Sequence, residues 1–244
     1  MNQNTQIRSV FHEQHKLDFL TLALEKQLEI DRYSKKILFH LSQDLEILEF
    51  ELGDSIDNII STSANLVQQK KSSTSHNNEE RQTQFVYIVC QGKVRLLSFD
   101  AETQQEVPIG LLTEGETFGS ENLFESEYLS YKAIAAKSKV QVARIPVVKL
   151  QSELAKLAQL QEHWLVEIRN RQNLIFFKTL TALRSLSSHR IEQILPYLEK
   201  RQILAGTNLA EANLHRFWIR HGQRRDLPVE IGSFWGYPAP ILDN

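Results

Sequence analysis

The sequence has little cysteine, no glycine over long stretches and no long apolar run, and each shortage excludes a class of protein. Its single cysteine, Cys90, excludes a disulfide framework and a metal site built from several thiolates. No apolar run approaches the roughly 18–20 residues that a membrane-spanning helix requires. The polar N-terminus lacks the apolar region of a signal peptide. We therefore expect a soluble cytoplasmic protein without a transmembrane segment.

A surplus of charge of one sign is also lacking. The 244 residues carry 28 Lys and Arg against 30 Asp and Glu, which gives 28 − 30 = −2. This balance excludes a strongly basic nucleic-acid-binding protein and an acidic tail protein. A hydrophobic content of 41% with 12 Phe and 3 Trp is enough to fill a core. At roughly 100–200 residues per domain, the length predicts one large domain or two small ones.

Glycine is absent between Gly119 and Gly206, where helices have least to interrupt them. Apolar residues at three- and four-residue steps predict helices over 16–41 and 147–178. Between these helices, short apolar or alternating runs typical of antiparallel strands cover 85–90, 93–99, 106–109 and 137–145. The nearly all-polar residues 61–84 predict a loop inserted between two strands. The expected order is a helix, a β unit and a long helix.

Five short segments give the β unit a recognisable order. They are Phe-His-Leu-Ser at 39–42, Leu-Gly-Asp-Ser-Ile at 52–56, Val-Tyr-Ile-Val-Cys-Gln-Gly-Lys-Val-Arg-Leu at 86–96, Leu-Thr-Glu-Gly-Glu-Thr-Phe-Gly at 112–119, and Ala-Ile-Ala-Ala-Lys-Ser-Lys-Val-Gln-Val at 133–142. Together they resemble the cyclic-nucleotide-binding (cNMP) domain superfamily over about residues 37–150. The resemblance implies a mainly-β fold with flanking helices: a double-stranded β-helix, or jelly-roll, barrel followed by a long C-terminal helix.

The resemblance also implies a phosphate-binding cassette, made of Phe118, Gly119, Ser120, Glu121, Asn122, Leu123, Ser130 and Tyr131. In family members that bind a ligand, a Glu directly after the glycine binds the ribose 2′-hydroxyl, and an Arg about nine residues later binds the cyclic phosphate. Here Ser120 follows Gly119, the acid comes one residue late at Glu121, and Ser130 takes the place of the Arg. The cassette is therefore degenerate.

The charges around this cassette predict weak or absent binding of cyclic AMP or cyclic GMP, and hence no cofactor. The three carboxylates of Glu121, Glu125 and Glu127 repel an anion. Loss of an Arg–phosphate pair removes on the order of 2–5 kcal/mol of binding free energy. Lys132 is the nearest cation in the sequence, and strand alternation predicts that it points elsewhere.

Residues 186–236 repeat the same order in shortened form. Leu186–Leu198 resembles the opening helix, Phe217–Gly222 resembles Tyr87–Gly92, and Gly232–Gly236 resembles Gly115–Gly119. The anchor glycines are 119 − 92 = 27 residues apart in the first copy and 236 − 222 = 14 in the second. We expect an N-terminal helical segment at 1–36, the barrel at 37–150, a helix or linker at 151–185 and a truncated second repeat at 186–244.

The tandem arrangement, with its Trp-Gly-Tyr-Pro segment at 235–238, resembles the N-terminal region of bacterial ABC exporters that carry a cysteine-peptidase domain. It suggests a detached or truncated front part of a longer protein. The sequence contains no ATP-binding motif of the Gly-x-x-x-x-Gly-Lys-Ser/Thr type. An ABC exporter or another protein is therefore the expected partner, and a homodimer through helix 147–178 is an alternative to simple core packing of that helix.

Three further features favour structural interpretations. Cys90 lies in a predicted core strand and reads as an inert buried thiol. The eight histidines lack metal-ligand spacing, so no metal is expected. The run 216–225 mixes cations with aromatics, as single-strand nucleic-acid binders do, but its Phe217–Ile219 segment fits a core strand.

No catalytic constellation emerges, so we predict a non-enzymatic regulatory or sensor module. The alternatives are a functional sensor of cyclic AMP or cyclic GMP, and a transcription regulator of the cyclic-AMP-receptor type. Against the latter, residues 179–200 are followed by a strand-like segment and not by a recognition helix.

Overall fold

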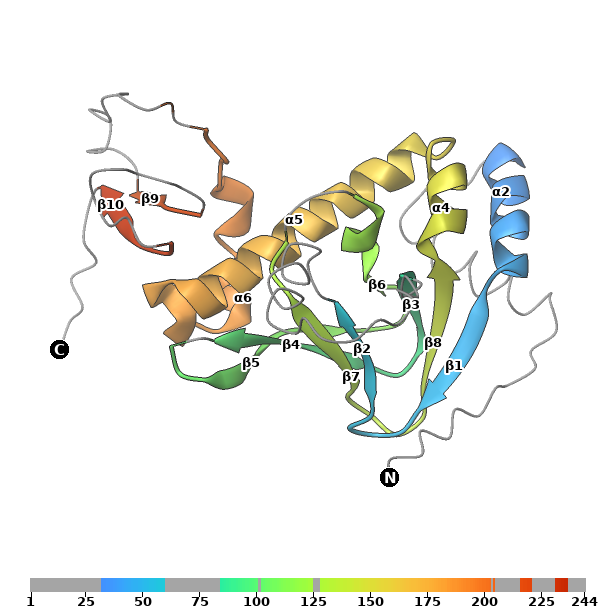
Figure 1. The fold of residues 1–244 in the computed structure, drawn as a ribbon, viewed down its shortest axis with the longest axis horizontal. Coiled ribbons are helices and arrows are strands. Elements are labelled where there is room, and N and C mark those ends of the chain that lie inside the picture. The colour runs from blue at the N-terminus through green and yellow to red at the C-terminus, as the bar shows by residue number, and fades with distance from the viewer. Residues whose placement is uncertain are drawn as a thin grey trace, which may run out of the picture. The chain divides into compact units, whose positions relative to one another are not determined.

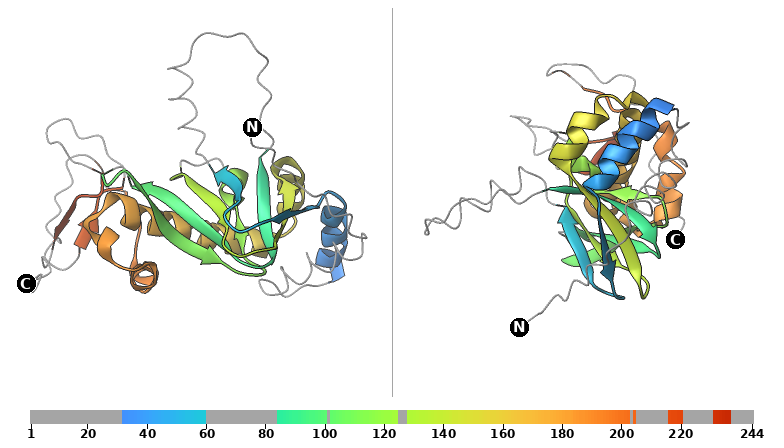
Figure 2. Two further views of the ribbon diagram at one scale, coloured as in Figure 1. Left: turned by 90° about the horizontal axis from the view of Figure 1, so that it is seen from below. Right: turned by 90° about the vertical axis from the view of Figure 1, so that its right-hand side faces the viewer.

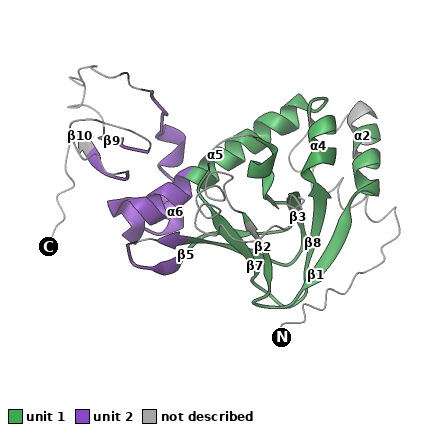
Figure 3. Cartoon of the chain, viewed as in Figure 1, with its two compact units in different colours: residues 1–98, 108–172 green, residues 99–107, 173–244 purple. Residues whose placement is uncertain are grey.

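The structure is a computed structural model that describes residues 32–59, 84–100, 102–124, 128–202, 204, 216–220 and 231–236. It divides into two compact units (Figure 3). Unit 1 comprises residues 1–98 and 108–172, and unit 2 comprises residues 99–107 and 173–244. Each unit is described by itself.

Unit 1 is built on two four-stranded sheets with antiparallel neighbours, which confirms the predicted mainly-β class with flanking helices. The first sheet has the order β1 (Glu46–Phe50), β8 (Val140–Pro146), β3 (Phe85–Gln91) and β6 (Thr117–Phe118). The second has the order β2 (Ser55–Ile59), β7 (Tyr131–Ala135), β4 (Val94–Asp100) and β5 (Gln105–Leu112), where the last two strands extend into unit 2. The strands predicted at 85–90, 93–99, 106–109 and 137–145 overlap β3, β4, β5 and β8, in that order.

Side chains along the strands alternate between two environments. Along β4 and β7, every second side chain is buried, as expected when one face of a sheet meets the core. In the first sheet Tyr87 pairs with Arg144 on one side and with Phe118 on the other, so β3 lies at the centre of the register. β6 and the segment after it are thereby attached to a fully paired strand.

The helices of unit 1 lie above its strands in Figure 1 and in the right-hand view of Figure 2. They are α2 (Arg32–Gln43), the short 3₁₀ helix η1 (Ser120–Leu123), α4 (Val147–Leu154) and the first two thirds of α5 (Ala158–Leu180). Their apolar faces meet the first sheet in one cluster, made of Ile37, Leu41, Leu45, Ile47, Val86, Ile88, Leu123, Ala143, Ile145, Val147, Leu150, Leu157, Leu160 and Trp164. None of the described helices is long and apolar enough to cross a membrane.

The single helix predicted over 147–178 is wrong in its continuity, because α4 ends at Leu154 and α5 begins at Ala158. A turn separates them, in which the Lys156 N–H donates to the Glu153 carbonyl. The sequence holds no Gly or Pro at this point, so local propensity does not announce the break. The turn places Leu150, Leu157 and Leu160 in the same buried cluster, and tertiary packing therefore decides the helix boundary.

Two predicted segments fall largely outside the described residues. The helix expected over 16–41 is described only from Arg32 onward, where α2 agrees with it. The polar insertion expected at 61–84 lies outside the described residues except for Gln84.

Unit 2 combines the end of α5 with short elements: η2 (Ala182–Ser185), α6 (Ser188–Glu192), η3 (Leu195–Tyr197), β9 (Arg216–Trp218) and β10 (Phe234–Gly236). The side chains of Thr181 and Ser187 accept from backbone N–H groups and so begin η2 and α6. Trp218 packs edge-on against Phe177 with ring centroids 5.1 Å apart. The segment is a strand, as predicted, but its residues are half-buried and not core residues.

The β9–β10 pair has the same internal register as the β3–β6 pair of unit 1. Phe217 pairs with Trp235 as Tyr87 pairs with Phe118, and Trp218 pairs with Phe234 as Ile88 pairs with Thr117. The preceding turns also agree: the Gly232 N–H donates to the Ile219 carbonyl (2.8 Å) and the Gly115 N–H to the Val89 carbonyl (2.9 Å), at φ 89° and 87°. This geometric equality supports the second, shortened repeat, which we propose for residues 186–244.

Candidate functional site

The candidate site begins at Gly119, where β6 ends and η1 begins. Gly119 has φ 75° and ψ 2°, a left-handed conformation that L side chains rarely adopt. A Cβ atom there would lie 2.7 Å from the Phe85 carbonyl oxygen and 3.3 Å from the Tyr87 ring. Glycine is therefore required both for the turn and for the close approach to β3.

Three side chains from different elements meet beside this turn, and their polar atoms are buried. The Tyr131 hydroxyl of β7 donates to Glu121 Oε2 of η1 at 2.8 Å. Arg171 Nη1 of α5 lies 3.0 Å from both Glu121 carboxylate oxygens and 3.0 Å from Tyr131 Oη. The exposed fraction is 0% for the Glu121 side chain and 9% for that of Arg171. The trio is thus a buried, closely coupled ion pair with a tyrosine in contact with both charges.

The pKa directions match this geometry. Burial alone would lower the pKa of Arg171, but the Glu121 carboxylate and Tyr131 raise it above its usual value. Burial raises the pKa of Tyr131 well above its usual value, and the Arg171 charge opposes this only in part. Arg171 is therefore a permanent cation, and Tyr131 keeps its proton for the bond to Glu121.

The backbone N–H of Gly119 is already engaged. It donates to Tyr131 Oη at 2.9 Å, and the same oxygen accepts from Arg171. A backbone N–H at this kind of turn is a donor that an anion would otherwise use. Here the chain's own tyrosine takes it.

Helix α5 is attached to the cassette at three successive points. The Thr117 hydroxyl of β6 donates to Glu167 (3.0 Å), and Arg171 Nη2 donates to the Thr117 carbonyl (2.6 Å). The Gln172 amide accepts from the Leu129 N–H (2.6 Å) and donates to the Leu129 carbonyl (3.1 Å). One face of α5 therefore holds both ends of the cassette.

Tyr87 links the two sheets next to Gly119. Its ring stacks on Phe118 with centroids 4.7 Å apart and planes 6° apart, and its hydroxyl donates to Asp57 of β2 at 2.6 Å. On the same strand pair, Arg144 lies 4.2 Å from the centroid of the Phe85 ring. The turn is thus bordered by tyrosines and has a second carboxylate, Asp57, nearby.

The other residues expected in the cassette have different environments. Asn122 accepts from the Tyr128 hydroxyl (2.7 Å), and Leu123 packs in the cluster below the helices. Ser120 is fully buried, and its hydroxyl has no partner among the described residues. Ser130, in the place of the family's Arg, is exposed, and its carbonyl accepts from Ser98 (2.8 Å). Glu125 and Glu127 lie outside the described residues.

Sequence reasoning missed Arg171, because it lies 50 residues beyond Glu121 on another element. One signal was available: polar residues at 163, 167 and 171 recur every four residues and so share one face of the predicted helix. That spacing identifies a polar stripe but not what the stripe contacts. Lys132, the cation nearest in the sequence, is not the one that the structure brings to Glu121.

The fold is a jelly roll of the cNMP-binding type, and residues 75–156, about a third of the chain, match the model of the cyclic nucleotide-binding domain family. No curated protein matches the chain.

Solved structures give further similarities at low identity. A mutant regulatory subunit of a cAMP-independent protein kinase A from Trypanosoma brucei, bound to cAMP, is 18% identical (TM-score 0.45), with 62% of this chain and 46% of that chain covered. A cyclic nucleotide-binding domain from Methylobacillus flagellatus is 12% identical (TM-score 0.47; 82% and 92% covered). The sensor domain of the regulator DNR from Pseudomonas aeruginosa is 14% identical (TM-score 0.46; 78% and 98% covered). The chain thus spans less than half the length of the kinase subunit.

Proposed function

We propose that this chain is a non-enzymatic regulatory module whose cassette is held by its own side chains and does not take up cyclic AMP or cyclic GMP. One observation carries this proposal: the Gly119 N–H donates to Tyr131, while Arg171, the cation at the site, is bound by Glu121. A ligand phosphate would have to replace both partners.

Charge makes that replacement unfavourable. Glu121 is fully buried within the cassette, where the attraction or repulsion between charges is stronger than in water. A phosphate that approached Arg171 would meet this carboxylate, and Ser130 supplies no guanidinium to offset the repulsion. Moving Glu121 aside would break its buried ion pair with Arg171. Loss of one partner of a buried pair costs several kcal/mol.

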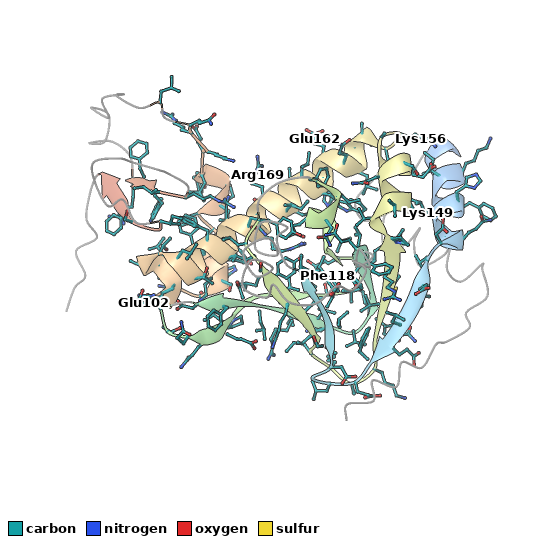
Figure 4. The ribbon with its side chains drawn as sticks, viewed as in Figure 1. Glu102, Phe118, Lys149, Lys156, Glu162 and Arg169 are labelled. Carbon is teal, nitrogen blue, oxygen red and sulfur yellow. The ribbon has the colours of Figure 1, made fainter. Side chains whose placement is uncertain are left out.

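We propose that α5 passes the state of the cassette to a partner, because Glu167, Arg171 and Gln172 of this helix bond to the cassette. On its outer side, α5 exposes Leu165 (44%) and Val166 (40%), and Glu162 and Arg169 of the same helix are exposed as well (Figure 4). This mixed face supports docking of a partner, which we propose to be an exporter of the ABC type or a second copy of the chain.

A titration of the full chain with cyclic AMP and with cyclic GMP tests the proposal. We expect no change in melting temperature up to millimolar nucleotide, because bound ligand would raise it by mass action. Saturable stabilisation at micromolar nucleotide would instead identify a functional cyclic-nucleotide sensor. AMP serves as the control for nonspecific effects of an adenine nucleotide.

A further inference from the structure

We infer that Glu121 is a built-in anion: its carboxylate fills an anion site formed by Arg171 and Tyr131, and a chain without this carboxylate accepts a small free carboxylate such as formate or acetate there. The inference rests on the proposed function, since it names what occupies the cassette in place of a ligand. It concerns the chemistry of the site and not a cyclic nucleotide.

Two donors of the site, Arg171 and Tyr131, converge on the Glu121 carboxylate. Arg171 Nη1 lies 3.0 Å from each Glu121 oxygen, and Tyr131 donates to Oε2 at 2.8 Å. The second nitrogen of Arg171 is committed to the Thr117 carbonyl at 2.6 Å. The guanidinium is thus held in place from β6 and presents its other side to the anion.

The position of the guanidinium favours an anion beside it. Arg171 is only 9% exposed, so water cannot solvate its charge well, and an arginine does not lose its proton in a protein. Removal of Glu121's carboxylate would leave the buried cation with the weaker attraction of Glu167, one turn earlier on α5. Such a site either loses stability or recruits an anion from solution.

The size of the vacancy selects the anion. Replacement of Glu121 by Ala removes one methylene and the carboxylate, which together correspond to the atoms of acetate. The backbone of η1 does not depend on this side chain, because the Asn122 N–H donates to the Gly119 carbonyl (3.1 Å) and the Phe124 N–H to the Glu121 carbonyl (3.1 Å). A formate or acetate ion can therefore meet the same two donors.

Occupancy of the site is transmitted to α5, since Arg171 belongs to that helix. With the carboxylate present, β6, η1, β7 and α5 share one polar centre. Without it, Gln172, Glu167 and the bonds of Arg171 to Thr117 and Tyr131 still attach the helix, but the ion pair between Arg171 and Glu121 is lost. Amide hydrogen exchange in 164–172 is then expected to be faster, and to slow again when a carboxylate is added.

The experiment compares the melting temperatures of full-length wild type, Glu121→Ala and Glu121→Gln in sodium formate, sodium acetate, sodium chloride of equal ionic strength, and acetamide. We expect formate and acetate to raise the melting temperature of Glu121→Ala by several degrees more than chloride or acetamide does, in a saturable way. Wild type and Glu121→Gln, in which the space is filled, are expected to respond to all four additives alike.

A response of Glu121→Ala to formate and acetate that is no larger than that of wild type would overturn the inference. If Glu121→Ala does not fold, its recovery on refolding with and without formate is measured, together with the double variant Glu121→Ala/Arg171→Met. We expect formate to restore Glu121→Ala, and the double variant to fold without it. A double variant as unstable as Glu121→Ala would also overturn the inference.

The nucleotide titration distinguishes failure of this inference from failure of the proposed function. Micromolar binding of cyclic AMP by wild type would contradict the proposed function. Lack of carboxylate rescue in a wild type that binds no nucleotide would contradict only the built-in anion.

Discussion

At the scale of single residues, Arg171 links the elements of the cassette to α5. It is buried, permanently charged and bonded to Glu121, Tyr131 and the Thr117 carbonyl. A buried ion pair contributes little beyond what well-packed apolar residues would, but breaking one partner is strongly unfavourable. The pair therefore fixes which side chains meet, more than it adds to the free energy of unfolding.

A double-mutant cycle tests this asymmetry. We expect Arg171→Met or Glu121→Gln alone to lower the free energy of unfolding by about 3–5 kcal/mol, because each leaves a buried polar group without its partner. The double variant is expected to lose less than the sum of the two. Urea unfolding of the four proteins measures this, and additive losses would show that the two charges do not interact.

Gly119 and Gly53 allow a matched comparison of two Gly→Ala substitutions at positive φ. Both have positive φ, at 75° and 90°, but an added Cβ meets the Phe85 carbonyl at 2.7 Å in the first and nothing within 4 Å in the second. Gly53→Ala should cost about 1–2 kcal/mol for the left-handed conformation. Gly119→Ala should cost roughly 1–3 kcal/mol more, from overpacking against β3. Equal losses in urea unfolding would mean that the turn at Gly119 has room for a side chain.

Cys90 is half-buried and not fully buried as predicted, but its thiol is expected to be inert in the folded protein. Burial raises the pKa of its thiol to about 12, so at pH 7 the thiolate is roughly a thousandfold scarcer than for a free cysteine. Reaction with a chromogenic disulfide reagent should be slow in buffer and complete in denaturant. Rapid labelling of the native chain would place this thiol in an open, polar environment.

At the scale of elements, the turn between β4 and β5 gives a pH dependence. Burial raises the pKa of Asp100, but bonds from the Thr103 hydroxyl and the Glu102 and Thr103 N–H groups, and the charge of Arg184, hold the pKa below its usual value. A lowered folded pKa means that the carboxylate stabilises unit 2 above the pKa of the unfolded chain, about 3.9. This contribution is lost as pH falls from about 4 through the folded pKa.

The expected result is therefore a loss of stability in unit 2 as the pH falls below about 4, and Asp100→Asn should lack this loss. Thermal unfolding followed over this pH range in both proteins measures the difference. Thr103→Ala, which removes one of the bonds, should give an intermediate slope. Identical acid limbs for wild type and Asp100→Asn would refute the assignment of this carboxylate.

Sequence patterns predicted elements better than contacts. Alternation and β-branched runs located β3, β4, β5 and β8, because these patterns reflect burial on one or both faces of a strand. The break at 155–157 carries no local signal, since it is imposed by packing of Leu150 and Leu157 in one cluster. The residues after Gly119 follow a local sequence pattern and could be predicted. Arg171 meets them only through tertiary packing, so its role could not be predicted.

At the scale of the whole molecule, the chain combines a cNMP-type jelly roll with a second unit in which the β9–β10 pair repeats the register of β3–β6. We propose that the first contains a cassette that its own side chains occupy. We propose that the two together form a regulatory module in which the cassette holds α5 and does not respond to cyclic nucleotides.

The most direct test is calorimetric titration of cyclic AMP into the full chain and into its Ser130→Arg variant, which restores a guanidinium at the family's position. If the missing Arg alone prevented binding, this variant would bind. Because the Gly119 N–H and Arg171 are already occupied, we expect neither protein to bind with a Kd below about 1 mM. Micromolar binding by wild type or by Ser130→Arg would contradict a cassette held by its own side chains.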